Sequence, residues 1–169
     1  GALHDATRNK RTRIRFVQKG TEWLEVLKGL LATLGHKSWM YREGKDREVY
    51  ALETTAKFLD FTFDPICLSE QEQAAYIRGF FDAEGGIPRI PQSKFYIQLV
   101  QKDPLKIAKL KTMLEAMNIS TGVIHNPSER VDPDYWRIFL STKSHQQFVK
   151  TIGSWHPRKY ATLRERMMI

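Results

Sequence analysis

Apolar residues recur along this chain with two periods, one typical of helices and one typical of strands. Helical spacing predicts amphipathic helices that begin near Glu22 and Pro104. A two-residue period predicts strands at 37–42, 48–54, 122–125 and 135–141. A further strand region is predicted from Ile87 to Gln101, where polar and apolar residues alternate. Helices and strands thus share one chain of the α+β class.

One further helix is predicted over 69–84, and it ends in the sequence YIRGFFDAEGG. Ser69 and Glu72 form a capping box at its start, and the pair Gly85 and Gly86 follows its end. Three small residues at a spacing of four make a smooth stripe for close packing against a second helix, namely Ala75, Gly79 and Ala83.

Two carboxylates, Asp82 and Glu84, lie in the last turn of this predicted helix. The helix dipole disfavours negative charge at a C-terminus, so a compensating cation is expected. A divalent metal would take oxygens from Glu84 and from backbone carbonyls that the helix end leaves free. The alternative is an ordinary amphipathic helix with two solvated acids and a glycine stop.

The chain contains an internal repeat. RIRFVQK at 13–19 matches YIQLVQK at 96–102, and each is followed by an amphipathic helix and a predicted hairpin. ALETTAKF from Ala51 and IFLSTKSH from Ile138 then lead alike into a further predicted helix. The sequence therefore predicts a duplicated α+β unit, with a first repeat at 1–66 and a second at 67–169.

The two repeats differ at their front ends. Counted back from the matching strands, Gly1 falls about where Gly85 stands, so a first acidic helix would precede residue 1. A protein with one acidic helix, a shortened chain and a helix from another chain all remain open. Asp5 is a conceivable substitute acid, but this count places it beyond the expected helix end.

Charge and composition indicate which class of molecule the protein binds. Lys and Arg number 27 against 19 Asp and Glu, giving a net charge of +8 and a pI near 9.6, which favours nucleic acid over a membrane surface. Cys67 is the single cysteine, and the five histidines lack metal-ligand spacing. With no signal peptide and no membrane-spanning apolar run in the sequence, an intracellular protein is expected.

The sequence IRGFFDAEG at 77–85 resembles the signature of the LAGLIDADG homing endonucleases, and the repeat resembles the two halves of their single-chain members. The resemblance implies a duplicated αββαββα unit whose two four-stranded antiparallel sheets form a DNA-binding saddle, with the first repeat incomplete at its N-terminus. It also implies a pseudo-twofold monomer if the first helix is present, encoded by an intron or intein.

The resemblance implies a catalytic centre as well. Glu84 would be the acid that binds Mg²⁺, or another divalent cation such as Ca²⁺ or Mn²⁺, together with the Gly85 backbone carbonyl. Gln18 and Gln101 match strand-end polar residues near that centre, and Lys159 resembles a basic residue near the scissile phosphate. An ordinary surface position for Lys159 remains open.

Candidate DNA-binding residues lie on the predicted strands, where Arg can pair with guanine, Gln with adenine and Lys with phosphate. They are Arg11, Arg13, Arg15, Arg89, Lys94, Tyr96, Gln98, Lys102 and Arg137. A solvated sheet face is the alternative interpretation of this pattern.

The reaction implied is metal-assisted hydrolysis of both strands of a long double-stranded DNA target. Two alternatives stay open, a DNA-binding module without cleavage and an RNA-binding splicing helper. Glu84 favours the enzyme, whereas the apparent lack of a first acid favours the alternatives.

Overall fold

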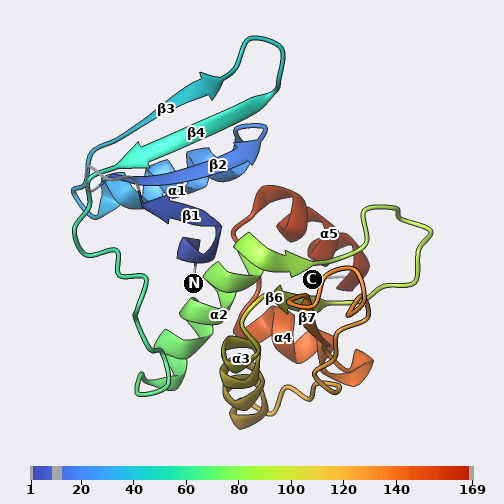
Figure 1. Ribbon diagram of the computed structural model, residues 1–169. Helices are drawn as coiled ribbons and strands as arrows, with labels where there is room; N and C mark the ends of the chain where they lie inside the picture. Colours follow the sequence, from blue (N-terminus) through green and yellow to red (C-terminus); the bar gives the residue numbers. More distant parts are fainter. Residues whose placement is uncertain (1, 9–12, 168–169) are drawn as a thin grey trace.

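The computed structural model describes residues 2–8 and 13–167, which form two α+β halves arranged around one central helix (Figure 1). In the first half, α1 packs against one face of an antiparallel sheet with strand order β1-β2-β4-β3. Its elements are η1 (Ala2–Asp5), β1 (Ala6–Arg8), β2 (Ile14–Lys19), α1 (Glu22–Thr33), β3 (Ser38–Glu43) and β4 (Val49–Thr54). This is the four-stranded sheet that the sequence predicts.

Strand alternation builds the core of the first half. Ile14 and Phe16 on β2 and Leu52 on β4 are buried together with Trp23 and Leu24 of α1. Neighbouring positions on the same strands point to the opposite face. Within residues 2–8 and 13–167, no helix covers that face, which carries several of the predicted DNA-binding residues (Figure 1).

The second half has its own core, formed by buried residues between positions 74 and 163. Its sheet has the order β5-β6-β7 and is also antiparallel. Its elements are α2 (Glu70–Glu84), β5 (Gly85–Gly86), β6 (Gln98–Gln101), α3 (Pro104–Ala116), β7 (Trp136–Phe139), η2 (Thr142–Ser144), α4 (His145–Thr151) and α5 (Pro157–Met167). The two cores lie on either side of the predicted boundary at 66/67.

The capping box of α2 forms as predicted. Ser69 accepts a hydrogen bond from the Glu72 amide, and the Glu72 carboxylate accepts one from the Ser69 amide at 3.0 Å. The helix then runs to Glu84, as the sequence indicates.

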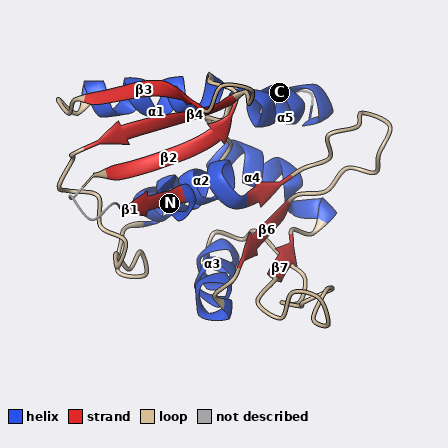
Figure 2. Cartoon of the chain, turned by 45° about the horizontal axis from the view of Figure 1, so that its top comes forward, coloured by secondary structure: helices blue, strands red, loops and turns tan. Residues whose placement is uncertain are grey.

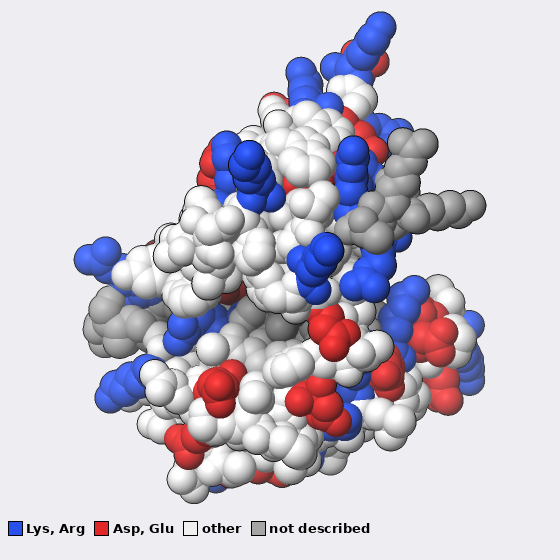
Figure 3. Space-filling model, turned by 90° about the vertical axis from the view of Figure 1, so that its left-hand side faces the viewer, with Lys and Arg blue, Asp and Glu red and all other residues white. Residues whose placement is uncertain are grey.

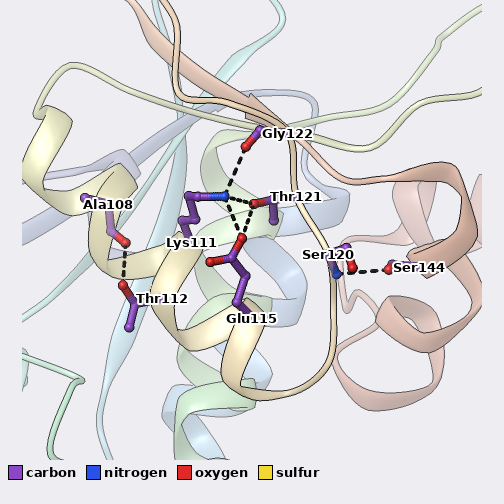
Figure 4. Close-up of polar contacts among 8 residues, drawn as sticks. All are labelled: Ala108, Lys111, Thr112, Glu115, Ser120, Thr121, Gly122 and Ser144. Carbon is purple, nitrogen blue, oxygen red and sulfur yellow. Dashed lines mark hydrogen bonds and ion pairs between the residues drawn. The ribbon is translucent and has the colours of Figure 1, made fainter.

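A fourth strand was predicted at 122–125, but within the described residues this segment forms only isolated bridges, Thr121 with Leu140 and His125 with Arg137. Lys111 of the neighbouring helix α3 also binds at the start of this segment (Figure 4). The Lys111 ammonium donates to Thr121 Oγ1 at 2.8 Å and to the Gly122 carbonyl at 3.2 Å. The segment therefore follows the sheet without joining it as a regular strand.

Two other predicted elements were wrong. The region from Ile87 forms no continuous strand, since pairing is confined to β5 and β6, and Pro88 and Pro91 in the connection cannot donate ladder hydrogen bonds. The helix expected after ALETTAKF is also missing between β4 and α2, where the structure describes turns. Asp60 and Asp64 bind the amides of Thr62 and Ile66 there, and such local bonds compete with helix formation.

The two sheets lie on either side of α2, which joins the halves (Figures 1 and 2). η1 packs against α2, and the Trp23 ring of the first half stacks on His156 of the second at 5.6 Å between centroids. Across residues 2–8 and 13–167, no helix is long and apolar enough to cross a membrane.

Candidate functional site

The acidic end of α2 lies at the junction of the two halves. Glu84 is the last residue of the helix and is half-buried, and the next residue, Gly85, already pairs with Leu99 of β6. Gly85 has an extended backbone with φ −72° and ψ 145°, so a left-handed conformation is not the reason for glycine here. A Cβ at Gly85 would collide with the Phe81 ring and lie 2.5 Å from the Phe81 carbonyl oxygen. The glycine permits the helix to turn directly into the strand.

A cation compensates the C-terminus of α2, as the sequence predicts, but it is Lys159 of α5. Its ammonium donates hydrogen bonds to the Phe81 carbonyl and, at 2.9 Å, to the Asp82 carbonyl. The residue is only 3% exposed, and its nitrogen lies 4.9 Å from the centre of the Phe81 ring. Lys159 thus fixes the turn that carries Glu84, and a direct role at the phosphate stays a prediction.

Asp82 connects α2 to the segment before α5. It is 2% exposed, and its carboxylate accepts hydrogen bonds from the Ser154 hydroxyl and from the Trp155 amide, the latter at 3.0 Å. Burial raises the pKa of Asp82, and the hydrogen bonds from Ser154 and Trp155 oppose this rise. The contacts give Asp82 a structural role beside Glu84.

Strand pairing identifies the counterpart of Glu84 in the first half. Leu99 and Phe16 occupy the same position in the sequence repeat, and they pair with Gly85 and Ala6 respectively. Asp5, which precedes Ala6 at the end of η1, therefore corresponds to Glu84 in backbone register.

The expectation that Asp5 lies beyond the helix end was wrong, because it assumed equal hairpin lengths. Ten positions separate Ala6 from Phe16, whereas fourteen separate Gly85 from Leu99. The shorter hairpin shifts the position equivalent to Glu84 four residues along the chain relative to a gapless count.

Gln18 and Gln101 occupy equivalent positions near the ends of β2 and β6, on the sides that face the cores. Gln101 Nε2 lies 3.1 Å from Nδ1 of His4, and His4 Nε2 lies 3.0 Å from the Tyr76 hydroxyl. Burial lowers the pKa of His4 to about 4, so the ring is neutral at pH 7. Through His4, Gln101 therefore helps to hold η1, the element that ends at Asp5, against α2.

The predicted DNA-binding residues of the first half meet on the uncovered sheet face. Arg13 is exposed and lies 5.3 Å from the centre of the Trp39 ring, and Arg15 is half-buried. Both contact Glu53, which is not among the residues predicted to bind DNA or to take part in catalysis. Arg11 lies outside the described residues.

In the second half, three predicted residues approach one another on the uncovered face. Arg137 donates to Nε2 of His125 at 3.1 Å and lies 4.9 Å from the centre of the Phe139 ring, while Tyr96 meets the same ring edge-on. Gln98 pairs with Phe139 on the neighbouring strand. Arg89 and Lys94 are exposed on the connection between β5 and β6, and Lys102 is exposed just after β6.

The predicted packing stripe on α2 is partly covered. Gly79 and Ala83 are half-buried, and Ala75 is exposed. A cavity of about 600 Å³ lies between α1, the 58–63 segment and the first turns of α2, with a mostly apolar lining that includes Tyr76 and Gln101. Glu84 does not line it, so this cavity and the acidic end of α2 are at different places in the molecule.

Charge is unevenly distributed on the side that faces left in Figure 1. Figure 3 shows Lys and Arg gathered over the upper part, formed by the first half, and Asp and Glu more frequent over the lower part. The basic residues of the first half are thus available to a polyanion.

A hard divalent cation fits the oxygen donors at the α2 end. The Glu84 carboxylate and the Gly85 carbonyl are half-buried at the junction. Among the described residues, no three His, Cys, Asp or Glu side chains form a ready-made metal site. Mg²⁺ commonly takes one or two carboxylates and completes its shell with water and substrate phosphates.

Comparisons with protein families and solved structures agree with the family resemblance of the signature at 77–85. A family model described as a LAGLIDADG-like domain matches residues 71–153. The chain belongs to the LAGLIDADG family. No curated protein matches it in sequence.

Solved LAGLIDADG structures share the whole fold. I-DmoI in complex with DNA and Mn matches with a TM-score of 0.65 and 20% identity over 92% of this chain and 95% of that one. I-DmoI with DNA and Ca gives 0.68 and 19% over 97% and 95%. The N-terminal LAGLIDADG domain of WhiA gives 0.68 and 15% over 89% and 76%. Similar TM-scores for the two proteins confirm the fold without choosing between their functions.

Proposed function

We propose that this LAGLIDADG protein is a site-specific DNA endonuclease that hydrolyses both strands with a divalent cation. The observation that carries the proposal is the equivalent placement of two acids, Glu84 and Asp5, each directly before the strand that opens its half. A double-strand cut needs one acid for each strand, and the register supports a source for both within this chain. The metal-containing I-DmoI complexes support a cation requirement by analogy.

In this mechanism the sheets bind the duplex, and the two acids meet the two scissile phosphates. Glu84 and the Gly85 carbonyl would hold Mg²⁺, which would supply an activated water and neutralise charge on the leaving oxygen. Asp5 is the candidate acid of the first half by its backbone position. Lys159 holds the end of α2 so that Glu84 keeps its position. Gln18 and Gln101 would orient groups near the strand ends, and Gln101 also fixes η1 through His4.

The test begins with a Mg²⁺-dependent selection on a randomised duplex library, in which both bound and cut molecules are sequenced. The selected site is then placed in a supercoiled plasmid. Wild-type protein should linearise the plasmid, whereas Glu84→Gln and Asp5→Asn should each lose linearisation while they retain binding. Unchanged linearisation by Asp5→Asn would exclude it as the first acid.

A DNA-binding module without cleavage is the second candidate, because Arg13 and Arg15 on the first sheet can contact a duplex whether or not the acids hold a cation. The match to the WhiA domain, with a TM-score as high as that of I-DmoI, leaves the function of this fold open. Bound but intact DNA with both wild-type protein and Glu84→Gln would favour this candidate. The same selection therefore discriminates the two functions.

A further inference from the structure

The uncovered face of the first sheet contains a buried carboxylate among cationic groups. Strand register brings Arg15 of β2, Glu53 of β4 and Trp39 of β3 into one row across the sheet. Glu53 is only 6% exposed, although no helix among the described residues covers this face. Its neighbours on the sheet therefore bury it.

Both oxygens of Glu53 are engaged. Oε2 lies 3.3 Å from Arg13 Nη1, and Oε1 accepts a hydrogen bond from the Tyr41 hydroxyl at 2.9 Å. Oε1 also lies 3.9 Å from Arg15 Nε. A carboxylate in this state has little capacity left to accept a hydrogen bond from a base, so direct reading of cytosine by Glu53 is disfavoured.

The two arginines contact carboxylates and are still partly exposed. Arg15 Nη2 lies 2.5 Å from Glu43 Oε1, and the Arg15 side chain is 27% exposed. This hydrogen bond with Glu43 raises the pKa of Arg15. The Arg13 side chain is 46% exposed and lies over the Trp39 ring. Arg13 is thus placed between Glu53 and the Trp39 ring, and Arg15 is placed by Glu43 and Glu53, while both side chains remain partly exposed.

Glu53 is negatively charged, so on charge alone it would weaken the binding of a polyanion to this surface. Repulsion from phosphates predicts that its removal strengthens binding to any DNA. Orientation of arginines predicts the opposite for a specific site, since bidentate Arg–guanine pairing depends on the plane of the guanidinium. The two effects can be separated by comparing a specific with a nonspecific duplex.

We infer that Glu53 is a positioning residue for sequence recognition, which holds Arg13 and Arg15 for bidentate contact with guanine edges in the major groove. This inference rests on the proposed recognition of a specific DNA site. In the second half, Arg137 is held instead by the His125 and Phe139 rings, so the two sheets would orient their arginines by different means.

The test measures affinity by fluorescence anisotropy for the selected duplex and for a scrambled duplex of equal length, in Ca²⁺ at several salt concentrations. Glu53→Gln should lower the preference for the selected duplex by about tenfold or more, the value of one bidentate pair. Its affinity for the scrambled duplex should stay equal or rise. Glu25→Gln, which removes an exposed carboxylate from α1 on the other side of the sheet, should leave the preference unchanged.

Equal strengthening of both affinities by Glu53→Gln, with the preference retained, would overturn the inference and leave the proposed function intact. A wild-type protein without any preference would instead contradict the proposed function and this inference together. If Glu53→Gln fails to fold by thermal denaturation, Arg13→Lys and Arg15→Lys decide. These keep the charge and lose the planar fork, so retention of the preference in both would overturn the inference.

Discussion

At the residue scale, Lys159 separates a structural from a catalytic interpretation. Replacing it by methionine should lower the free energy of unfolding by about 2 kcal/mol, because the Asp82 and Phe81 carbonyls would lose a buried cationic donor at the helix end. Urea denaturation followed by circular dichroism measures the change. Lys150→Met, at an exposed position on α4, is the matched control and should leave the stability nearly unchanged.

The same variants test the role that the sequence analysis assigned to Lys159. Loss of plasmid cleavage by Lys159→Met at unchanged stability would mean that the ammonium acts on the phosphate and that its contacts with α2 contribute little. Reduced stability, with a Mg²⁺ requirement shifted to higher concentration, would support its action through the position of Glu84.

At the element scale, the sequence predicted structures that depend on local signals. The extent of α2 follows from Ser69 and Glu72 three residues apart, and strands β3 and β4 follow from alternation within six residues. The segment at 122–125 has a strand-like sequence, but it forms only isolated bridges with its neighbours, and Lys111 of α3 binds the Gly122 carbonyl at its start. No local pattern reveals this contact. Contacts between distant residues explain this difference.

Lys111 offers a test of that explanation. Its replacement by methionine should increase hydrogen exchange at the amides of Gly122 and His125, because the segment would lose the bonds that hold it against α3. Lys109 lies on the same helix as Lys111, and Lys109→Met, which removes an exposed ion pair with Asp64, is the control. Equal protection in both variants would mean that the bridges to β7 suffice to hold the segment.

The sequence predicted those parts of the candidate site that depend on a single element. Glu84 at the end of α2 follows from one helix and its glycine stop, and the structure places it there. Asp5 required the length of the first hairpin, and Glu53 required the pairing of three strands. Both are register properties, which a sequence repeat without a fixed loop length does not define.

At the scale of the whole molecule, two neutral histidines join the halves. His4 bridges η1 to Tyr76 and Gln101, and His156 stacks on Trp23. Burial lowers the pKa of each to about 4, and nearby cations, Lys106 for His4 and Lys159 for His156, act in the same direction. Protonation would place a poorly solvated charge in the contact between the halves.

These histidines predict that the protein loses stability in mild acid. Between about pH 6.5 and pH 4 the unfolded chain binds protons at both sites and the folded chain does not, so the free energy of unfolding falls as the pH falls. The loss should be on the order of 1–2 kcal/mol per histidine after partial solvent exposure is allowed for. Burial also lowers the pKa of His145, whereas the raised pKa of Asp82 acts with the opposite sign, so single variants are needed to assign the effect.

Urea midpoints of wild-type, His4→Gln and His156→Gln proteins at pH 7 and pH 5 provide the measurement. Each variant should show a smaller difference between the two pH values than wild type, and an unchanged difference would mean that the contact between the halves tolerates protonation.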